Sequence, residues 1–195
     1  MVTYVEGDAT SPKDKSGNVI IAHGCNDEAK WGAGFVLAVS KKWPMAERAY
    51  RTWPKSHPNK PIRREADGSC FSLGSVQFVA VESPTGKPGH ESYERPFLFV
   101  ANMITQRGIM AINGSPPVRY YAIAKALSIV ATQARLFNAS VHMPKVGCGL
   151  AGGDWDIVEY IIEQELEGID VFVYEFKDIS SSSFVTQDEI ARRLV

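Results

Sequence analysis

The sequence has few of the features that mark secreted, membrane-spanning or metal-binding proteins. Its 195 residues include three cysteines, Cys25, Cys70 and Cys148, which lie far apart and form no CxxC or cysteine–histidine cluster with zinc spacing. We therefore expect a reducing, cytoplasmic environment and no structural metal. No window is apolar enough to span a bilayer, and the N-terminus lacks the basic and long apolar regions of a signal peptide, so we expect no membrane partner.

An excess of charge of either sign is also missing. Lysine and arginine number 21 against 22 aspartates and glutamates, which gives a net charge of −1. Such a balance favours neither duplex nucleic acid nor an anionic membrane as the main partner. The basic segment 55–64 is either a solvated surface loop or a contact to a nucleic-acid backbone, and the balanced charge favours the surface loop.

Apolar, β-branched runs alternate with segments of helical periodicity along the chain. This alternation predicts an α/β fold, a three-layer α/β/α sandwich with a mixed central sheet, in which ligands bind at the carboxyl ends of strands. We expect strands at Val2–Glu6, Asn18–His23, Val76–Val81, Phe97–Ile104, Ser140–Met143 and Val171–Phe176, and helices at Phe35–Lys42, Met45–Trp53, Arg119–Phe137 and after Asp154.

The last residues differ in character from the rest. A serine run at 180–183 reads as a joint, and Thr186-x-x-Glu189 matches a capping box for a short helix. The sequence therefore predicts a main domain at 1–178, followed by a Ser-rich joint and a short C-terminal helix at 179–195.

A glycine-rich loop between a strand and a helix dominates the second half of the chain. Pro144 ends the predicted strand, four glycines follow between residues 147 and 153, and Ile157, Val158, Ile161, Ile162 and Leu166 form one helical face after Asp154. Strand, glycine loop and helix start let backbone N–H groups point at an anion. The loop lacks the lysine and hydroxyl of an NTPase P-loop, so it is either a phosphate cradle without NTPase chemistry or a plain connector.

A second loop of this kind follows the strand at Asn18–His23. It contains Gly32 and Gly34, but Leu37 stands where a dinucleotide fingerprint needs its third glycine, so the Rossmann signal is weak.

Four polar residues near these loops each allow two interpretations. Asp8 is a turn residue or a ligand acceptor, and Asp154 is a helix N-cap or a general base. His23 is an acid or base near neutral pH, or a buried structural histidine. Cys148 is a thiolate nucleophile activated by the helix N-terminus, or merely part of the phosphate loop.

Taken together, four ordered motifs resemble the macrodomain family, whose members bind ADP-ribose. They are VEGDAT at residues 5–10, NVIIAHGCN at 18–26, KWGAGFV at 30–36 and MPKVGCGLAGGDW at 143–155. The resemblance extends over residues 1–176. It is strongest to the branch of ADP-ribose 1″-phosphate phosphatases and of enzymes that strip ADP-ribose from proteins or nucleic acid, because that branch has an Ala-His-x-x-Asn stretch like that at 22–26.

The resemblance implies a role for each matching residue. Asp8 would accept a hydrogen bond from the adenine amino group with Ala9 beside it, and Asn26 would contact the distal ribose. Gly32, Ala33 and Gly34 would line the diphosphate and distal ribose. The further ligand-binding positions are Ala22, Trp31, Pro144, Gly147, Cys148, Gly149, Leu150, Ala151 and Gly152.

The sequence also departs from relatives that have catalytic residues in fixed places. The loop after the strand at Phe97–Ile104 carries Thr-Gln-Arg at 105–107 where some relatives have a lysine, and Ala151 stands where some have an acid. Two functions stay open: a hydrolase of an ADP-ribose derivative, using His23, Asn26, Asp27 or Asp154, and a non-catalytic ADP-ribose reader. No cofactor is expected, and nucleic acid is expected only as a modified substrate.

Overall fold

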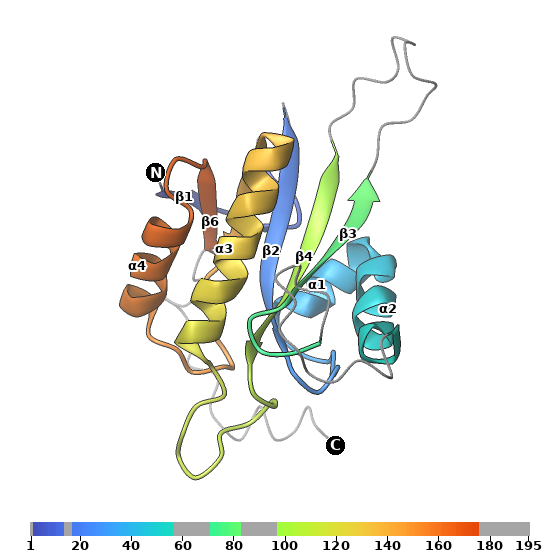
Figure 1. Ribbon diagram of the computed structural model, residues 1–195, viewed down its shortest axis with the longest axis vertical. Helices are drawn as coiled ribbons and strands as arrows, with labels where there is room; N and C mark the ends of the chain where they lie inside the picture. Colours follow the sequence, from blue (N-terminus) through green and yellow to red (C-terminus); the bar gives the residue numbers. More distant parts are fainter. Residues whose placement is uncertain (1, 14–16, 57–70, 83–96, 176–195) are drawn as a thin grey trace, which may run out of the picture.

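The computed structural model describes residues 2–13, 17–56, 71–82 and 97–175 as a mixed six-stranded sheet with helices on both faces (Figure 1). The strands are β1 (Val2–Glu6), β2 (Asn18–Asn26), β3 (Val76–Glu82), β4 (Leu98–Gln106), β5 (Ala139–Pro144) and β6 (Val171–Glu175). Their order is β1-β6-β5-β2-β4-β3, and every pair is parallel except β3 with β4. The predicted three-layer α/β/α sandwich is therefore confirmed.

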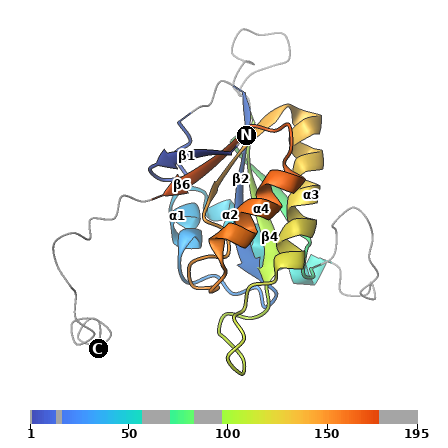
Figure 2. The same cartoon turned by 90° about the vertical axis from the view of Figure 1, so that its left-hand side faces the viewer.

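The helices divide between the two faces of the sheet, as the side view shows (Figure 2). Helices α3 (Tyr120–Phe137) and α4 (Trp155–Glu165) pack with the larger apolar cluster on one face. Helices α1 (Phe35–Lys42) and α2 (Pro44–Thr52), followed by the 3₁₀ turn Trp53–Ser56, pack with the second cluster on the other. Because both faces are covered, β2 and β4 are buried almost throughout, which explains their continuous apolar runs.

The helix boundaries follow local chemistry. Pro44 is the first residue of α2, where its missing N–H costs nothing, so α1 and α2 are separate helices. Asp154 caps α4 by accepting a hydrogen bond from the Asp156 N–H at 3.0 Å, and Asn138 ends α3 in the left-handed region. The predicted cap at Asp154 is confirmed.

Several predictions need correction or lie beyond the described residues. Strand β2 continues past His23 to Asn26, because Gly24 and Cys25 pair with Met103 and Ile104 of β4. Ile157, expected on the buried face of α4, is 43% exposed. The C-terminal joint and helix, residues 57–64 of the basic segment, and Cys70 lie outside the described residues.

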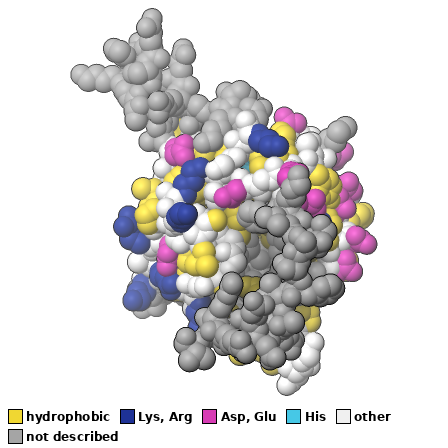
Figure 3. Space-filling view, turned by 180° about the vertical axis from the view of Figure 1, so that it is seen from behind, with side chains coloured by type: hydrophobic (Ala, Val, Ile, Leu, Met, Phe, Trp, Pro, Cys, Tyr) yellow, Lys and Arg dark blue, Asp and Glu magenta, His cyan; other side chains and the backbone are white. Residues whose placement is uncertain are grey.

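Charges are distributed unevenly over the surface. From behind, lysine and arginine side chains gather on the side of α1 and α2, and most acidic side chains lie on the other side (Figure 3). In the described part of the chain, no helix is long and apolar enough to cross a membrane.

Candidate functional site

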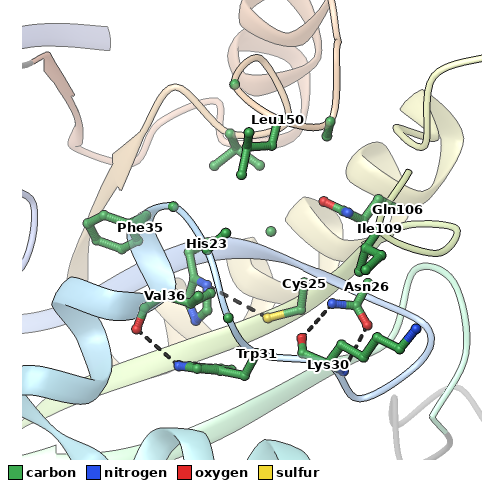
Figure 4. Close-up of a pocket in the computed structure, with 18 of the residues that line it drawn as sticks. His23, Cys25, Asn26, Lys30, Trp31, Phe35, Val36, Gln106, Ile109 and Leu150 are labelled. Carbon is green, nitrogen blue, oxygen red and sulfur yellow. Dashed lines mark hydrogen bonds between the residues drawn. The ribbon is translucent and has the colours of Figure 1, made fainter. Parts of the chain in front are cut away.

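A cavity of about 640 Å³ opens at the carboxyl ends of β2, β4 and β5. Three segments form most of its wall: the end of β2 with the loop that follows, the end of β4 with the start of the next loop, and the glycine loop after β5 (Figure 4). This volume lies in the range typical of small-molecule sites. Of the residues predicted from sequence, it is lined by His23, Asn26, Trp31, Gly32, Ala33, Gly34, Pro144, Gly147, Gly149, Leu150 and Ala151.

The first glycine loop is held in shape by Asn26. The Asn26 side-chain oxygen accepts hydrogen bonds from the N–H groups of Glu28 and Lys30, both at 3.0 Å, and its amide donates to the Lys30 carbonyl at 2.6 Å. These bonds close a tight turn in which Ala29 has φ 55°. Asn26 therefore builds one wall of the cavity.

Trp31 fixes the far end of the same loop. Its indole N–H donates to the Val36 carbonyl at 3.1 Å, and Arg51 of α2 donates to the Trp31 carbonyl at 2.7 Å. The ring is buried against His23 and Tyr50. The segment between this fixed tryptophan and the start of α1 is exposed and consists of Gly32, Ala33 and Gly34.

The second glycine loop is closed by its own backbone. The Gly153 N–H donates to the Gly147 carbonyl at 2.8 Å, and the Gly152 N–H donates to the Gly149 carbonyl at 3.0 Å. Gly147 and Gly152 have φ values of 76° and 68°, which favour glycine, and a Cβ at Gly147 would lie 3.1 Å from Val118. The sequence pattern of glycines thus reflects a compact turn packed against residues before α3.

Between these bonds the loop presents its own donors to the cavity. Within the described residues, the N–H groups of Gly149, Leu150 and Ala151 have no acceptor in the protein, although all three residues line the cavity. Leu150 hangs over the opening, opposite His23, Trp31 and Asn26 (Figure 4). Consecutive N–H groups ahead of a helix N-terminus form an anion-binding concavity.

His23 lies beneath the cavity and is fully buried. Asn102 donates from its amide to the Ala46 carbonyl and to Gln77, so its oxygen faces His23 and accepts from Nε2 at 2.7 Å. Burial lowers the pKa of His23 to about 4, because the charged ring would lose its hydration. The ring is therefore neutral at pH 7, and the geometry favours the structural interpretation over the acid–base one.

Asp27 does not line the cavity and instead connects two loops. Its Oδ1 accepts from the Gly108 N–H at 2.8 Å, and Oδ2 lies 3.9 Å from Nε of Arg107. Asp27 thus ties the first glycine loop to the loop that follows β4, which makes it a positioning residue for the cavity mouth.

Asp154 and Cys148 also lie outside the lining. Asp154 caps α4, as the N-cap interpretation of the sequence predicted. Burial, with a smaller contribution from the Asp154 charge, raises the pKa of the Cys148 thiol. A raised thiol pKa argues against the thiolate nucleophile, whose reactivity needs a lowered one.

Asp8, Ala9, Ala22 and Gly152 are the other predicted residues that the cavity does not reach. Asp8 accepts from the Thr10 N–H at 2.8 Å in a local turn at the end of β1, and Ala9 and Ala22 are buried. A Cβ on Gly152 would lie 3.2 Å from Pro116. The turn interpretation of Asp8 is thus realised in the structure, and its contact to adenine stays a prediction.

Several lining residues were not expected from the sequence. Phe35 and Val36 belong to the KWGAGFV motif, so the motif could have identified them as lining residues. Arg51, Gln106 and Ile109 carry no local signal, because they come to the cavity only through packing of α2 and the end of β4. The remaining unexpected residues are Gly24, Cys25, Lys30, Lys145 and Val146.

The cations around the mouth are each paired with a carboxylate. Lys30 lies 2.7 Å from Glu28, Arg51 lies 2.8 Å from Glu47, and Lys145 contacts Glu175. The described residues contain no cluster of three or more His, Cys, Asp or Glu side chains suited to a metal ion. Attraction for an anion at this site therefore rests mainly on backbone N–H groups.

Comparisons with known proteins point to one family. No family model matches the chain. A macrodomain protein from Streptomyces coelicolor is 44% identical, with a TM-score of 0.66 over 90% of this chain and 99% of that one. A Bacteroides thetaiotaomicron protein of unknown function is 46% identical, with a TM-score of 0.73 over 89% of this chain and 97% of that one. The curated ADP-ribose 1″-phosphate phosphatase of Lodderomyces elongisporus is 26% identical over 183 residues, 89% of this chain and 97% of its own length.

Proposed function

The chain belongs to the macrodomain family, and from that premise we propose that it binds ADP-ribose and hydrolyses an ADP-ribose derivative at the distal ribose. The observation that carries the binding proposal is the row of unpaired N–H groups at Gly149, Leu150 and Ala151 in the cavity wall. A diphosphate needs several such donors, and these donors are already fixed in place by the closed loop, so binding costs little ordering.

The support for hydrolysis comes from relatives. Curated relatives of 24–26% identity from three yeasts are each named ADP-ribose 1″-phosphate phosphatase. We propose that the enzyme breaks the bond that joins the distal ribose to a phosphate or to a macromolecule.

The geometry limits which side chains take part. His23 is buried and neutral, the Asn26 side chain is engaged within its loop, Asp27 holds Gly108, and Asp154 caps α4. We propose that catalysis relies on fixed backbone donors that stabilise developing negative charge, with Asn26 holding the loop that positions the distal ribose.

A non-catalytic reader is the second candidate, and one observation favours it. Of the four residues considered for catalysis, Asp27 and Asp154 do not line the cavity, the Asn26 amide does not ionise, and His23 is buried with a lowered pKa. A reader needs only the cradle, which the cavity has.

One set of measurements separates the candidates. Calorimetry with free ADP-ribose tests the cradle, and turnover assays on ADP-ribose 1″-phosphate and on ADP-ribosylated protein and DNA test hydrolysis. We expect binding together with release of phosphate or of the ADP-ribosyl group. Binding without turnover of any of these compounds would establish the reader, and absence of binding at millimolar ADP-ribose would refute both.

A further inference from the structure

The loop between β4 and α3, residues 107–119, carries an apolar tip at the mouth of the cavity. It projects beyond the end of the sheet (Figure 1). Ile109 is 46% exposed, Met110 72% and Ile112 59%. Exposure of several large apolar side chains to water in one loop is unfavourable, and a partner that covers them removes this cost.

This tip has a defined backbone shape. Ile112 and Ser115 exchange two backbone hydrogen bonds of 3.1 and 3.0 Å around Asn113 and Gly114. Asn113 and Gly114 have φ values of 51° and 78°, as a tight hairpin turn of type I′ requires. The Asn-Gly pair therefore presents Ile112 at the base of a built turn.

The base of the loop is also tied down. The Arg107 N–H donates to the Pro117 carbonyl at 2.9 Å, and the Arg119 guanidinium donates to the carbonyls of Pro116 and Val118 at 2.6 and 2.7 Å. By donating to these carbonyls, the Arg119 guanidinium fixes the backbone of the last residues of the loop, and the Arg107–Pro117 bond ties them to the residue that follows β4. A surface ordered in advance loses little conformational entropy when a partner binds.

The loop is continuous with the cavity on both sides. Asp27 holds Gly108 from the first glycine loop, and Val118 donates to the Ala151 carbonyl of the second at 3.3 Å. Ile109 itself lines the cavity, as does Leu150 across the opening, which is 75% exposed. The loop thus runs from the cavity, at Ile109, out to the exposed Met110 and Ile112.

The charges of the mouth do not suit a nucleic acid. Arg107 is paired with Asp27, and Arg119 is used on carbonyls of its own loop. The other described cations at the opening, Lys30, Arg51 and Lys145, each have a carboxylate partner. Binding of a phosphate backbone depends on lysine and arginine charges that replace counterions, and of these cations all but Arg119 already lie beside a carboxylate.

We propose that Met110 and Ile112 form a docking surface for a polypeptide segment that carries the ADP-ribosyl group, with apolar side chains flanking the modified residue. This assignment rests on the proposed function, because the cavity must first hold the ADP-ribose. The segment leaves the cavity past Ile109 and Leu150 and covers the apolar tip.

The test uses the full chain and peptides joined to ADP-ribose through a non-hydrolysable linkage. One peptide has leucine and phenylalanine beside the modified residue, one has serine and glycine there, and a third probe is an ADP-ribosylated DNA oligonucleotide. The variant is the double substitution Met110→Ser and Ile112→Ser, neither of which lines the cavity. Leu136→Ser, at the exposed far end of α3, is the matched control for loss of an exposed apolar side chain.

We expect the wild type and Leu136→Ser to bind the apolar peptide about tenfold more tightly than the polar one. The double variant should lose this preference and keep its affinity for free ADP-ribose. Equal binding of both peptides by the wild type, a preference that survives in the double variant, or tightest binding of the oligonucleotide would overturn the docking surface while leaving the cradle intact. A wild-type dimer that becomes a monomer in the double variant would assign the tip to self-association instead. If the wild type does not bind free ADP-ribose, the proposed function itself is overturned.

Discussion

Gly149→Glu places a negative charge where the diphosphate is expected to lie. Gly149 lines the cavity and has no neighbour within 4 Å of a Cβ built on it, and its φ is not in the left-handed region. A Cβ at this position therefore meets neither a clash nor backbone strain. The variant should fold like the wild type, and its effect on binding should be local.

The size of the effect follows from the donors in the loop. Each charge-assisted hydrogen bond contributes about 1.5–3 kcal/mol, so loss of two costs about 3–6 kcal/mol. This corresponds to a loss of ADP-ribose affinity of roughly 10²- to 10⁴-fold. Gly149→Gln has similar bulk without the charge and should lose less, and Gly149→Ala, whose methyl group enters open space, should stay within a few fold of the wild type.

The assay is calorimetric titration with ADP-ribose, accompanied by thermal unfolding with and without ligand and by circular dichroism. In the wild type, ligand should raise the melting temperature by mass action, and in Gly149→Glu this rise should vanish. A folded Gly149→Glu protein that binds ADP-ribose with wild-type affinity would refute the assignment of the second glycine loop as the anion cradle.

Substitutions at three further positions test individual parts of the site. Gly153→Ala puts a Cβ 2.7 Å from the Gly147 carbonyl oxygen, so we expect about 1–3 kcal/mol lower unfolding free energy by urea titration; unchanged stability would show that the loop yields. Asp154→Ala should cost about 1 kcal/mol as a lost cap, whereas Asp154→Asn should restore stability, and both should retain turnover; inactivity of a stable Asp154→Asn protein would return Asp154 to the role of base. The pKa of His23 is lowered to about 4, below its unfolded value of 6.5, so the unfolded chain binds the extra proton first and stability is lost as pH falls from 6.5 towards 4. The loss at pH 5 should be about 2 kcal/mol relative to pH 7 and smaller in His23→Gln, and equal losses in both proteins would contradict the assignment.

The secondary structure was predictable because its signals are local. Pro44 separates two helices, Asp154 caps a third, and apolar runs mark strands covered on both faces. The glycine loops were equally visible, since a strand followed by several glycines and a capped helix needs no tertiary information. The end of β2 was missed for the opposite reason: Gly24 and Cys25 are held in the sheet by β4, which lies far along the chain.

The chemistry of individual side chains was harder to predict. Whether His23 is an acid–base group depends on its burial under Trp31 and Phe35 and on the amide of Asn102, none of which is visible from its neighbours in sequence. Asp27 looked like a possible catalytic carboxylate, but its partner, Gly108, is 81 positions away. Such pairings arise only when separate loops meet at the edge of the sheet.

The pairing of β1 with β6 has a consequence for how the chain acquires its structure during synthesis. In the described sheet β1 lies at one edge and its ladder partner is β6, with Val2 opposite Val171. Strand β1 therefore waits without this partner until β6 has been made, and such distant pairings slow folding. A chain cut short before residue 171 would lose two strands at once and leave β5 as an open, apolar edge, a template for aggregation. Incomplete chains of this protein should consequently be removed or precipitate, even when both glycine loops are already present.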